Sequence, residues 1–591
     1  RLLGGNLTGA VCINLLRHPA WGRAQETYGE DTHHLGAMGA ALTRGIQRHA
    51  IACVKHYALN SMENARFSVD VTIDDRALHE IYLPHFKACV DAGAQSFMSA
   101  YNSVNGEWAG QNKGLLDDIL RGRWGFEGFV LTDFIFGVRD GEKAIKAGLD
   151  LEMPFPMVWG RFLGSMVQKG SVDEALLDRA LERAIMPQFQ LPPIEEYEAS
   201  DLGCEAHKAL AREAAVQSIT LLKNEDDLLP LRPDANIVML GELAAKPTLG
   251  DRGSSDGRPD HAVHPLEGMQ VASTGSVTHF DAIDAASERQ VREAEAVLIL
   301  VGNTYREEGE YIAPLSNLAT LAENFPPPPN WHWLFGRPSM RWLWKRLVRA
   351  SLGFAARKQK KNFDAEQGSF GRGGDRESLR LKPEHAALIQ QAAALNPNVI
   401  VALIGGSAIV MEEWKEAAKG IAMLWYPGQE GGHALADIVY GTRNPSGRLP
   451  FSIPSDESHL PFFDKDATAI TYDLWHGYRK LRRDGAAPAF PFGFGLSYTD
   501  FAIEMLTADK SEYVAGETAT LTARATNTGE RDGDLVVQVY ASVPDSKVER
   551  GDRELKAFAR VSLKVGETRE VALALPMERL AFFDTAVDDF R

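Results

Sequence analysis

Several features that define common protein classes are scarce in this sequence or absent from it. Its 591 residues include only four cysteines, and no CxxC motif or Cys/His cluster places them for a metal site. Three of the four lie inside apolar runs, so we expect reduced core residues; the cysteines are Cys12, Cys53, Cys89 and Cys204. No uninterrupted apolar stretch reaches about 18 residues, so the sequence predicts no transmembrane helix.

Positive charge is also in short supply. The 63 basic residues stand against 80 acidic ones, and the net charge of −17 repels phosphate backbones and argues against a nucleic-acid partner. The remaining composition, 45% hydrophobic and 24% charged, is that of a soluble globular protein. At about 150 residues per domain the length predicts three or four domains. The chain opens with Arg1 in mid-pattern, so a preceding signal peptide stays open, and with it a cytoplasmic, periplasmic or secreted location.

Residues 1–190 alternate short apolar runs with helical stretches, which is typical of βα units. The runs are GAVCINL, AIACVKHY, SFMSAYN, FVLTDF and LDLEMP. Each ends in polar residues, and the carboxyl ends of barrel strands are where such side chains converge on a substrate. A closed barrel has eight such units. We therefore expect a (β/α) TIM-like barrel whose first strands are missing.

Two further domains are expected after a proline-containing linker at 191–210. Residues 211–455 contain NIVMLGE, AVLILVGN and NVIVALIGG, with helical segments such as Pro383–Leu395 between them. This pattern predicts an open, mostly parallel sheet covered by helices, an αβα sandwich. After a connecting segment, 456–498, the period changes to two in residues 499–591, which predicts a small antiparallel β-sandwich.

One insertion, near 325–365, departs from the acidic composition. After the run FPPPPN it combines tryptophans with many Arg and Lys, and MRWLWKRLVRASLGFAARKQKK predicts a basic amphipathic helix. Three interpretations stay open: a helix packed on its own domain or on a neighbouring subunit, a lid over a substrate site, or a contact with a membrane surface. As a lid, it would favour bulky, aromatic or terpenoid-like leaving groups.

The strongest candidate for chemistry is Asp133, a carboxylate directly after the apolar strand GFVLT. At a barrel strand end it can act as nucleophile, general base or metal ligand, although strand-end Asp residues also cap helices. Lys55 and His56 end another strand, where they suit sugar hydroxyls or form an ordinary salt bridge at the rim.

Taken in order, the motifs resemble glycoside hydrolase family 3, of the β-glucosidase type. The matching segments are HPAWGRAQETYGED, CVKHYALN, FMSAYNSVNG, GFVLTDF, SITLLKNEDDLLPL, WYPGQEGGHALADIVYGTRNPSGRLPFSIP and PFGFGLSYT. Their collinearity is more specific than any one motif. The resemblance implies a TIM-like barrel, an αβα sandwich and a C-terminal fibronectin type III-like domain. It also implies that the first part of the barrel and the last strands of the third domain are absent.

The resemblance implies a role for single residues. Asp133 matches the catalytic nucleophile, although Phe134 replaces the tryptophan that follows it in the family. Other positions match residues that hold the terminal sugar, the last two less closely: Arg23, Lys55, His56, Tyr101, Arg66 and Met98. A further sugar-binding aspartate would precede Arg1.

In the family that the motifs resemble, the general acid/base is a glutamate from the second domain, and the segment Arg306–Ile312 is similar to the family pattern around it. Aligning the first Glu-Gly selects Glu308, whereas aligning on Tyr-Ile leaves Glu310, one place away; Glu307 is the third candidate. A retaining mechanism needs two carboxyl groups about 5 Å apart, one ionised and one protonated. It requires no metal or organic cofactor.

We therefore expect a retaining exo-β-glycosidase that removes the terminal non-reducing β-D-glucosyl residue from a glucoside or oligosaccharide. The alternatives are a non-catalytic carbohydrate-binding scaffold, and a β-xylosidase or a glycoside phosphorylase on the same fold. The His-Asp acid/base variant of the family is disfavoured, because Lys55-His56 is followed by YALN and not by a PGHG-like segment. The exact sugar and a homo-oligomeric state stay open.

Overall fold

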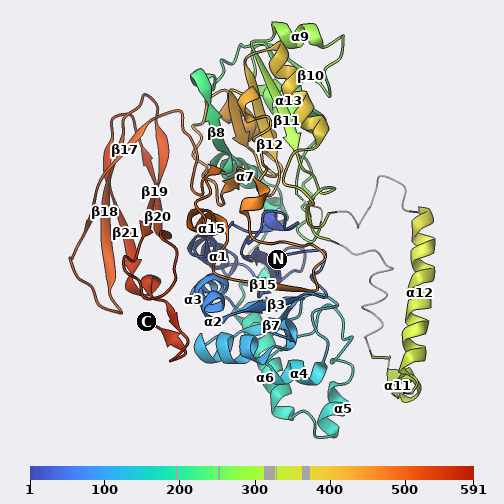
Figure 1. Ribbon diagram of the computed structural model, residues 1–591. Coiled ribbons are helices and arrows are strands. Elements are labelled where there is room, and N and C mark those ends of the chain that lie inside the picture. Colours follow the sequence, from blue (N-terminus) through green and yellow to red (C-terminus); the bar gives the residue numbers. More distant parts are fainter. Residues whose placement is uncertain (195–196, 251–252, 312–325, 328, 338, 363–372) are drawn as a thin grey trace.

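The computed structural model describes residues 1–194, 197–250, 253–311, 326–327, 329–337, 339–362 and 373–591. Figure 1 shows three bodies: the first α/β body (blue to cyan) below, the second α/β body (green to orange) above it, and an all-β body (red) along one side. A separate helical arm, α11 and α12, stands on the opposite side.

The first body is built on a parallel four-stranded sheet in the order β1-β2-β4-β7. Its strands are β1 (Leu7–Cys12), β2 (Ile51–Tyr57), β4 (Ser96–Ser99) and β7 (Phe129–Leu131). Leu151 adds a parallel bridge to Leu131, so all five predicted runs take part. Every residue of β2, β4 and β7 is buried, as expected for a parallel sheet covered by helices.

Helices between these strands cover the sheet: α1 (Thr32–Ile46), α3 (Pro84–Asp91), η4 (Gly114–Arg123), α4 (Gly141–Lys146) and α6 (Glu174–Ile185). Asp31 caps α1 by accepting a hydrogen bond from the His34 N–H. Helices α1 and α3 pack closely at Gly39, where a Cβ would lie 2.9 Å from the Cys89 Sγ.

A second sheet joins distant parts of the chain, in the order β15-β3-β5-β6. Its strands are β15 (Ala469–Tyr472), β3 (Asp70–Ile73), β5 (Ser103–Val104) and β6 (Glu107–Trp108). The segment expected only to connect two domains therefore contributes a strand to the first body, a pairing that local sequence patterns do not reveal.

The second body contains a six-stranded sheet in the order β10-β9-β11-β12-β13-β8, in which only the edge strand β8 is antiparallel. The strands are β8 (Thr220–Asn224), β9 (Ile237–Leu240), β10 (Val277–Phe280), β11 (Ala296–Gly302), β12 (Val399–Ile404) and β13 (Gly420–Met423). The helices that pack around it include α7 (Glu205–Ser218), α8 (Pro265–Ala272), α9 (Glu288–Glu293), α13 (Pro383–Leu395) and α14 (Gly431–Val439). The predicted mostly parallel sheet is confirmed, and α13 has the predicted bounds.

The third body is an antiparallel β-sandwich. One sheet has β17 (Phe501–Ala508), β18 (Thr518–Asn527) and β21 (Thr568–Pro576), and the other has β19 (Gly533–Ala541) and β20 (Glu554–Leu563). Every second residue of β18 is buried, which matches the period of two in the sequence. Phe558 of β20 lies against the ring of His34, with ring centres 5.5 Å apart, and so joins this body to α1.

The insertion forms α11 (Pro329–Phe335) and α12 (Arg341–Asn362). Phe335 is buried between the two helices, with its ring centre 5.6 Å from that of Trp331 and 5.8 Å from that of Trp344. The predicted basic helix is thus present as α12. Among the described residues, no helix combines the length and apolarity needed to cross a bilayer.

Candidate active site

Polar side chains from four neighbouring strand ends converge at the carboxyl edge of the first sheet. The loop after β1 carries Arg23, Lys55 and His56 lie just before the last residue of β2, Tyr101 follows β4, and Asp133 follows β7. Asp133 Oδ2 lies 3.7 Å from His56 Nε2, and Arg23 Nη1 lies 3.2 Å from the same nitrogen. The structure therefore brings together residues that are up to 110 positions apart.

Asp133 has one oxygen engaged and one facing the cluster. Its Oδ1 accepts the N–H of Phe134 at 2.8 Å, whereas Oδ2 is buried without a hydrogen bond among the described residues. Burial raises the pKa of Asp133, and the positive charges of Arg66 and Arg23 partly offset that rise. A carboxylate oxygen that no donor occupies suits a nucleophile.

His56 is a neutral part of this cluster. Burial, followed by the charges of Arg23 and Lys55, lowers its pKa well below the usual value. Its Nδ1 lies 3.0 Å from Asn14 Oδ1, an acceptor, so the ring proton is on Nδ1 and Nε2 accepts from Arg23. The contact with Asp133 is therefore not an ion pair.

Glu26 holds two of the cations in place. Arg23 donates to both of its oxygens, at 2.6 and 2.8 Å, and Lys55 Nζ lies 3.6 Å away. Burial alone would raise the pKa of Glu26, but Arg23 and then Lys55 lower it overall, so the carboxylate is ionised. Glu26 is not among the residues predicted from the sequence, although its spacing of three residues from Arg23 was a possible signal.

Glu310 enters the cluster from the second body. The loop after β11 places its Oε1 3.2 Å from Arg66 Nη1 and 4.0 Å from Arg23 Nη1. Burial favours the protonated form, but Arg23 and Arg66 outweigh it and lower the pKa of Glu310 to about 2. The charge of Glu310 in turn raises the pKa of Asp133, which places the two carboxylates in one electrostatic site.

Glu308 has a different environment. Its Oε1 accepts from the Gly406 N–H at 2.5 Å and from the Tyr426 hydroxyl at 2.7 Å, and its Oε2 accepts from Asn303 at 3.1 Å. Arg376 Nη1 lies 3.5 Å from the same Oε2. Glu308 is therefore buried among partners of its own body, and its carboxylate is fully occupied.

The chain turns between these two glutamates at Gly309. Its φ of 145° is a backbone conformation that residues other than glycine rarely adopt. This turn separates the directions of Glu308 and Glu310, which an extended chain would point to one side. Glu307, the third candidate, pairs with Lys382 at 2.8 Å and lies outside the cluster contacts. Of the three glutamates, the described contacts bring Glu310 to Arg66 and Arg23, so the first alignment, which selected Glu308, does not match this geometry.

Arg66 connects the two bodies at the site. It pairs with Glu63 at 2.9 Å, donates to the Tyr311 carbonyl at 2.9 Å, and lies over the Tyr101 ring, 5.0 Å from its centre. Burial raises the pKa of Glu63 to about 8 even though Arg66 opposes that rise. Met98, by contrast, packs in a small apolar cluster with Leu131.

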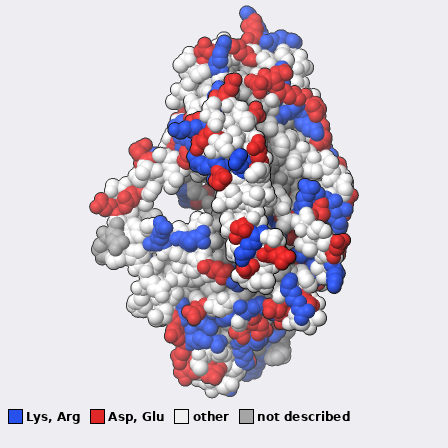
Figure 2. Space-filling view, turned by 90° about the vertical axis from the view of Figure 1, so that its left-hand side faces the viewer, with Lys and Arg blue, Asp and Glu red and all other residues white. Residues whose placement is uncertain are grey.

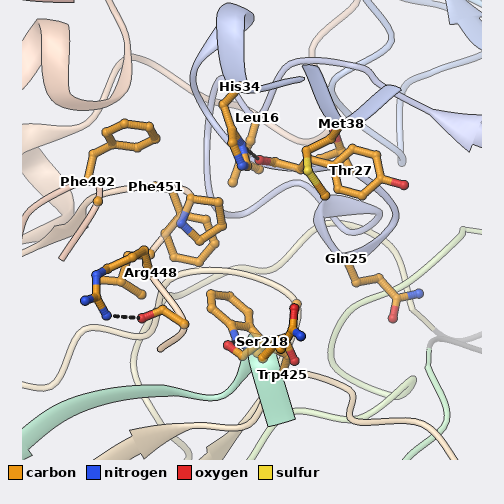
Figure 3. Close-up of a pocket in the computed structure, with 18 of the residues that line it drawn as sticks. Leu16, Gln25, Thr27, His34, Met38, Ser218, Trp425, Arg448, Phe451 and Phe492 are labelled. Atoms are coloured by element: carbon orange, nitrogen blue, oxygen red, sulfur yellow. Dashed lines mark hydrogen bonds between the residues drawn. The ribbon is translucent and has the colours of Figure 1, made fainter. Parts of the chain in front are cut away.

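A cavity of about 950 Å³ lies beside this cluster, between the three bodies. Figure 3 shows Trp425, Phe451 and Phe492 around it, with Gln25 on the side nearest the loop after β1. Glu26 lines both the cavity and the cluster, but neither Asp133 nor Glu310 belongs to the cavity wall. We therefore place the chemistry at the Asp133–Glu310 cluster and not in this cavity.

Comparison with known proteins supports the domain types. Family models match at residues 3–186 (glycosyl hydrolase family 3 N terminal domain), 219–498 (glycosyl hydrolase family 3 C-terminal domain) and 535–591 (fibronectin type III-like domain). Thermostable beta-glucosidase B of Acetivibrio thermocellus is 30% identical over 585 residues, which cover 98% of this chain and 71% of that protein. An exo-alpha-(1->6)-L-arabinopyranosidase of Bifidobacterium longum is 32% identical over 594 residues, with the same two coverages, 98% and 71%.

Solved structures of known proteins resemble this chain over nearly its whole length. The GH3 beta-glucosidase of Bifidobacterium adolescentis matches with a TM-score of 0.80 and 28% identity, covering 99% of this chain and 79% of that one. Beta-glucosidase 3B of Thermotoga neapolitana in complex with glucose matches with a TM-score of 0.79 and 28% identity, covering 98% of this chain and 79% of that one. The predicted combination of two α/β domains and a fibronectin type III-like domain is confirmed.

Proposed function

Because the chain belongs to glycoside hydrolase family 3, of the β-glucosidase type, we propose that it is a retaining, exo-acting β-glucosidase with Asp133 as nucleophile and Glu310 as acid/base. One observation carries this proposal. Two carboxylates from different domains meet in one buried cluster: Glu310 lies 3.2 Å from Arg66 and 4.0 Å from Arg23, and Asp133 lies 3.7 Å from His56, which Arg23 contacts at 3.2 Å. A double displacement requires such a pair of carboxyl groups.

In the first step, Asp133 Oδ2 attacks the anomeric carbon. The glycosidic bond breaks, the leaving-group oxygen takes a proton from the acid, and an ester joins the sugar to Asp133. Burial raises the pKa of Asp133, and the charges of Arg66 and Arg23 oppose that rise and so favour the ionised form that a nucleophile needs. Water then attacks the ester with the same acid group acting as base, and the released sugar keeps its configuration.

Glu310 is ionised in the free protein because Arg23 and Arg66 flank it. To act as acid it must gain a proton, so its pKa must rise when the sugar binds. A sugar that takes hydrogen bonds from Arg66 and excludes water would weaken the Arg66–Glu310 pair and produce this rise. We therefore propose that substrate binding switches Glu310 to its protonated form.

Three cationic side chains and one hydroxyl group remain to bind the sugar itself. Lys55, Arg23 and Arg66 can donate to hydroxyl oxygens, and Tyr101 can donate once released from the Phe134 carbonyl, which it contacts at 2.9 Å. Such donors stabilise the transition state where hydrogen bonds strengthen as charge develops at the ring. Met98 can supply only an apolar contact.

The test is hydrolysis of p-nitrophenyl β-D-glucoside by the wild type, Asp133→Ala and a surface control, Asp91→Ala. We expect Asp133→Ala to lose at least about 10³-fold in kcat, and azide to restore turnover with a glycosyl azide of inverted configuration. Asp91 is exposed in α3, so its variant should match the wild type. Full activity of Asp133→Ala would remove it as nucleophile.

The same assay decides the sugar class. Because some relatives are arabinopyranosidases, p-nitrophenyl α-L-arabinopyranoside and β-D-xyloside are assayed in parallel, with and without phosphate. We expect the β-glucoside to have the highest kcat/KM, without a requirement for phosphate. A faster reaction on another glycoside would keep the mechanism and change the named substrate.

A further inference from the structure

The helical arm formed by α11 and α12 is the feature that glycoside hydrolysis does not explain. It is inserted in the acid/base loop: the chain leaves the cluster after Tyr311 and returns at Gly374, whose N–H donates to the Gly309 carbonyl at 2.8 Å. Figure 1 shows both helices standing apart from the three bodies, on the side opposite the β-sandwich. Its small core is formed between α11 and α12 themselves, around Phe335.

The charge of the arm is opposite to that of the protein. Residues 329–362 contain nine Lys and Arg and no Asp or Glu, although the whole chain has a net charge of −17. Without these nine charges the rest of the chain has a net charge of −26. Figure 2 shows the face opposite the arm, where acidic and basic side chains are interspersed. Positive charge is therefore concentrated in the arm.

Large apolar side chains accompany this charge. Trp331, Trp333 and Trp342 have exposed fractions of 52%, 69% and 58%, and Leu347 of α12 has 45%. Such side chains rarely stay in water without a role when they occur together. Tryptophan has an apolar ring and a polar N–H, which suits the boundary between headgroups and hydrocarbon.

The spacing in α12 separates the aliphatic side chains from the arginines, whereas Trp342 shares the face of Arg346 and Arg349, which follow it by four and seven residues. Leu343 and Leu347 are four residues apart, and so are Trp344 and Val348. Together these four residues form one apolar stripe along the helix. The exposed Arg341, Arg346 and Arg349 lie on the remaining circumference. Because α11 covers only part of the apolar stripe, Leu347 is left for another partner.

We propose that the arm, residues 329–337 and 339–362, binds the surface of an anionic lipid bilayer and attaches the enzyme peripherally. Lys and Arg would contact phosphate headgroups, Trp342 would lie among the arginines at the level of the headgroups, and Leu347 would enter the interface, as in other basic amphipathic helices. A polyanion such as nucleic acid would use the arginines but leave the aliphatic stripe in water. The negative charge of the remaining chain keeps the rest of the protein away from the same surface.

The experiment measures co-sedimentation of the whole protein with vesicles of phosphatidylcholine, alone or mixed with phosphatidylglycerol. The test variant is the triple charge reversal Arg341→Glu, Arg346→Glu and Arg349→Glu. Its matched control reverses three exposed lysines of the first domain, Lys113→Glu, Lys146→Glu and Lys169→Glu. A second variant, Trp333→Ser with Trp342→Ser, tests the apolar contribution without changing charge.

We expect binding to mixed vesicles only, weakened by salt, and lost at least about 10²-fold in the arm charge reversal. The lysine control should bind like the wild type, and the tryptophan variant should bind more weakly. Absence of binding by the wild type, equal binding by the charge reversal, tighter binding to an RNA homopolymer, or a salt-stable dimer formed through the arm would each overturn the proposal.

Catalysis is a separate readout. All arm variants should hydrolyse p-nitrophenyl β-D-glucoside in solution like the wild type, because the Asp133–Glu310 cluster is built from residues outside the arm. If the wild type is inactive but binds vesicles, only the proposed function fails; if it is active and does not bind, only the membrane proposal fails.

Discussion

Asp375 and Asn64 hydrogen-bond each other reciprocally across the junction of the two α/β domains. Asp375 Oδ2 accepts the N–H of Asn64 at 2.9 Å, and Asn64 Oδ1 accepts the N–H of Asp375 at 2.9 Å. Asp375 also accepts the N–H groups of Gly22 and Glu63, each at 3.0 Å. Asp375 directly follows Gly374, where the chain returns from the insertion after Glu310. This pair therefore ties the acid/base loop to the domain that carries the nucleophile.

The variant Asp375→Asn should therefore impair catalysis from a distance. An amide can accept on one atom only, so its NH₂ group would face a backbone N–H donor where the carboxylate now accepts. Such an unsatisfied buried group costs about 1–3 kcal/mol, and we expect the loop to loosen, with kcat falling about 10-fold or more and KM changing little. Steady-state kinetics checks this, with the exposed Asp466→Asn as control; unchanged kcat would contradict the role of the pair.

Glu310→Gln should affect catalysis, whereas Glu308→Gln should affect stability. We expect Glu310→Gln to lose about 10²–10⁴-fold with poor leaving groups, to lose less with dinitrophenyl glucoside, and to form a glycosyl azide of retained configuration. Glu308→Gln should lower the unfolding temperature, because Arg376 and Gly406 lose a charged partner. Should Glu308→Gln show the leaving-group dependence instead, the acid/base role returns to Glu308.

Arg66 should control the pH dependence of the reaction. Its guanidinium, together with Arg23, lowers the pKa of Glu310 against the effect of burial. Arg66→Gln removes one of the two charges, so the pKa of Glu310 rises and the acid stays protonated to higher pH. We expect a lower kcat/KM whose basic limb moves to higher pH, measured as a pH–rate profile beside the exposed Arg44→Gln. An unmoved basic limb would separate Arg66 from the acid/base.

His476 should make stability depend on pH. It is buried, its Nε2 donates to the Glu30 carbonyl at 2.9 Å, and burial lowers its pKa to about 3. The unfolded chain binds a proton near pH 6.5 and the folded protein does not, so stability is lost as pH falls below about 6.5. One pH unit below that value, the wild type should lose about 1.4 kcal/mol that His476→Gln does not lose. Urea unfolding of both proteins at neutral and mildly acidic pH measures this difference; parallel losses would refute it.

Much of the fold was predictable because it depends on local patterns. Buried parallel strands are short apolar runs, so β2, β7, β11 and β12 were visible in the sequence. Two other edge strands were not: β8 pairs antiparallel at the margin of the second sheet, and β15 pairs with β3 nearly 400 residues away. Such pairings depend on tertiary neighbours and leave no periodic signal.

The sequence by itself determined which side chains are available at strand ends, and therefore the candidacy of Asp133, Lys55 and His56, because strand ends follow from hydrophobic periodicity. Arg23 became a candidate through the family resemblance. Only the tertiary structure decided which glutamate meets them. Glu308 and Glu310 differ by two positions in one acidic segment, and the turn at Gly309 sends one into its own domain and the other across the junction. That choice rests on long-range contacts, since Arg66 and Glu310 are separated by 244 residues and meet only after both domains have folded.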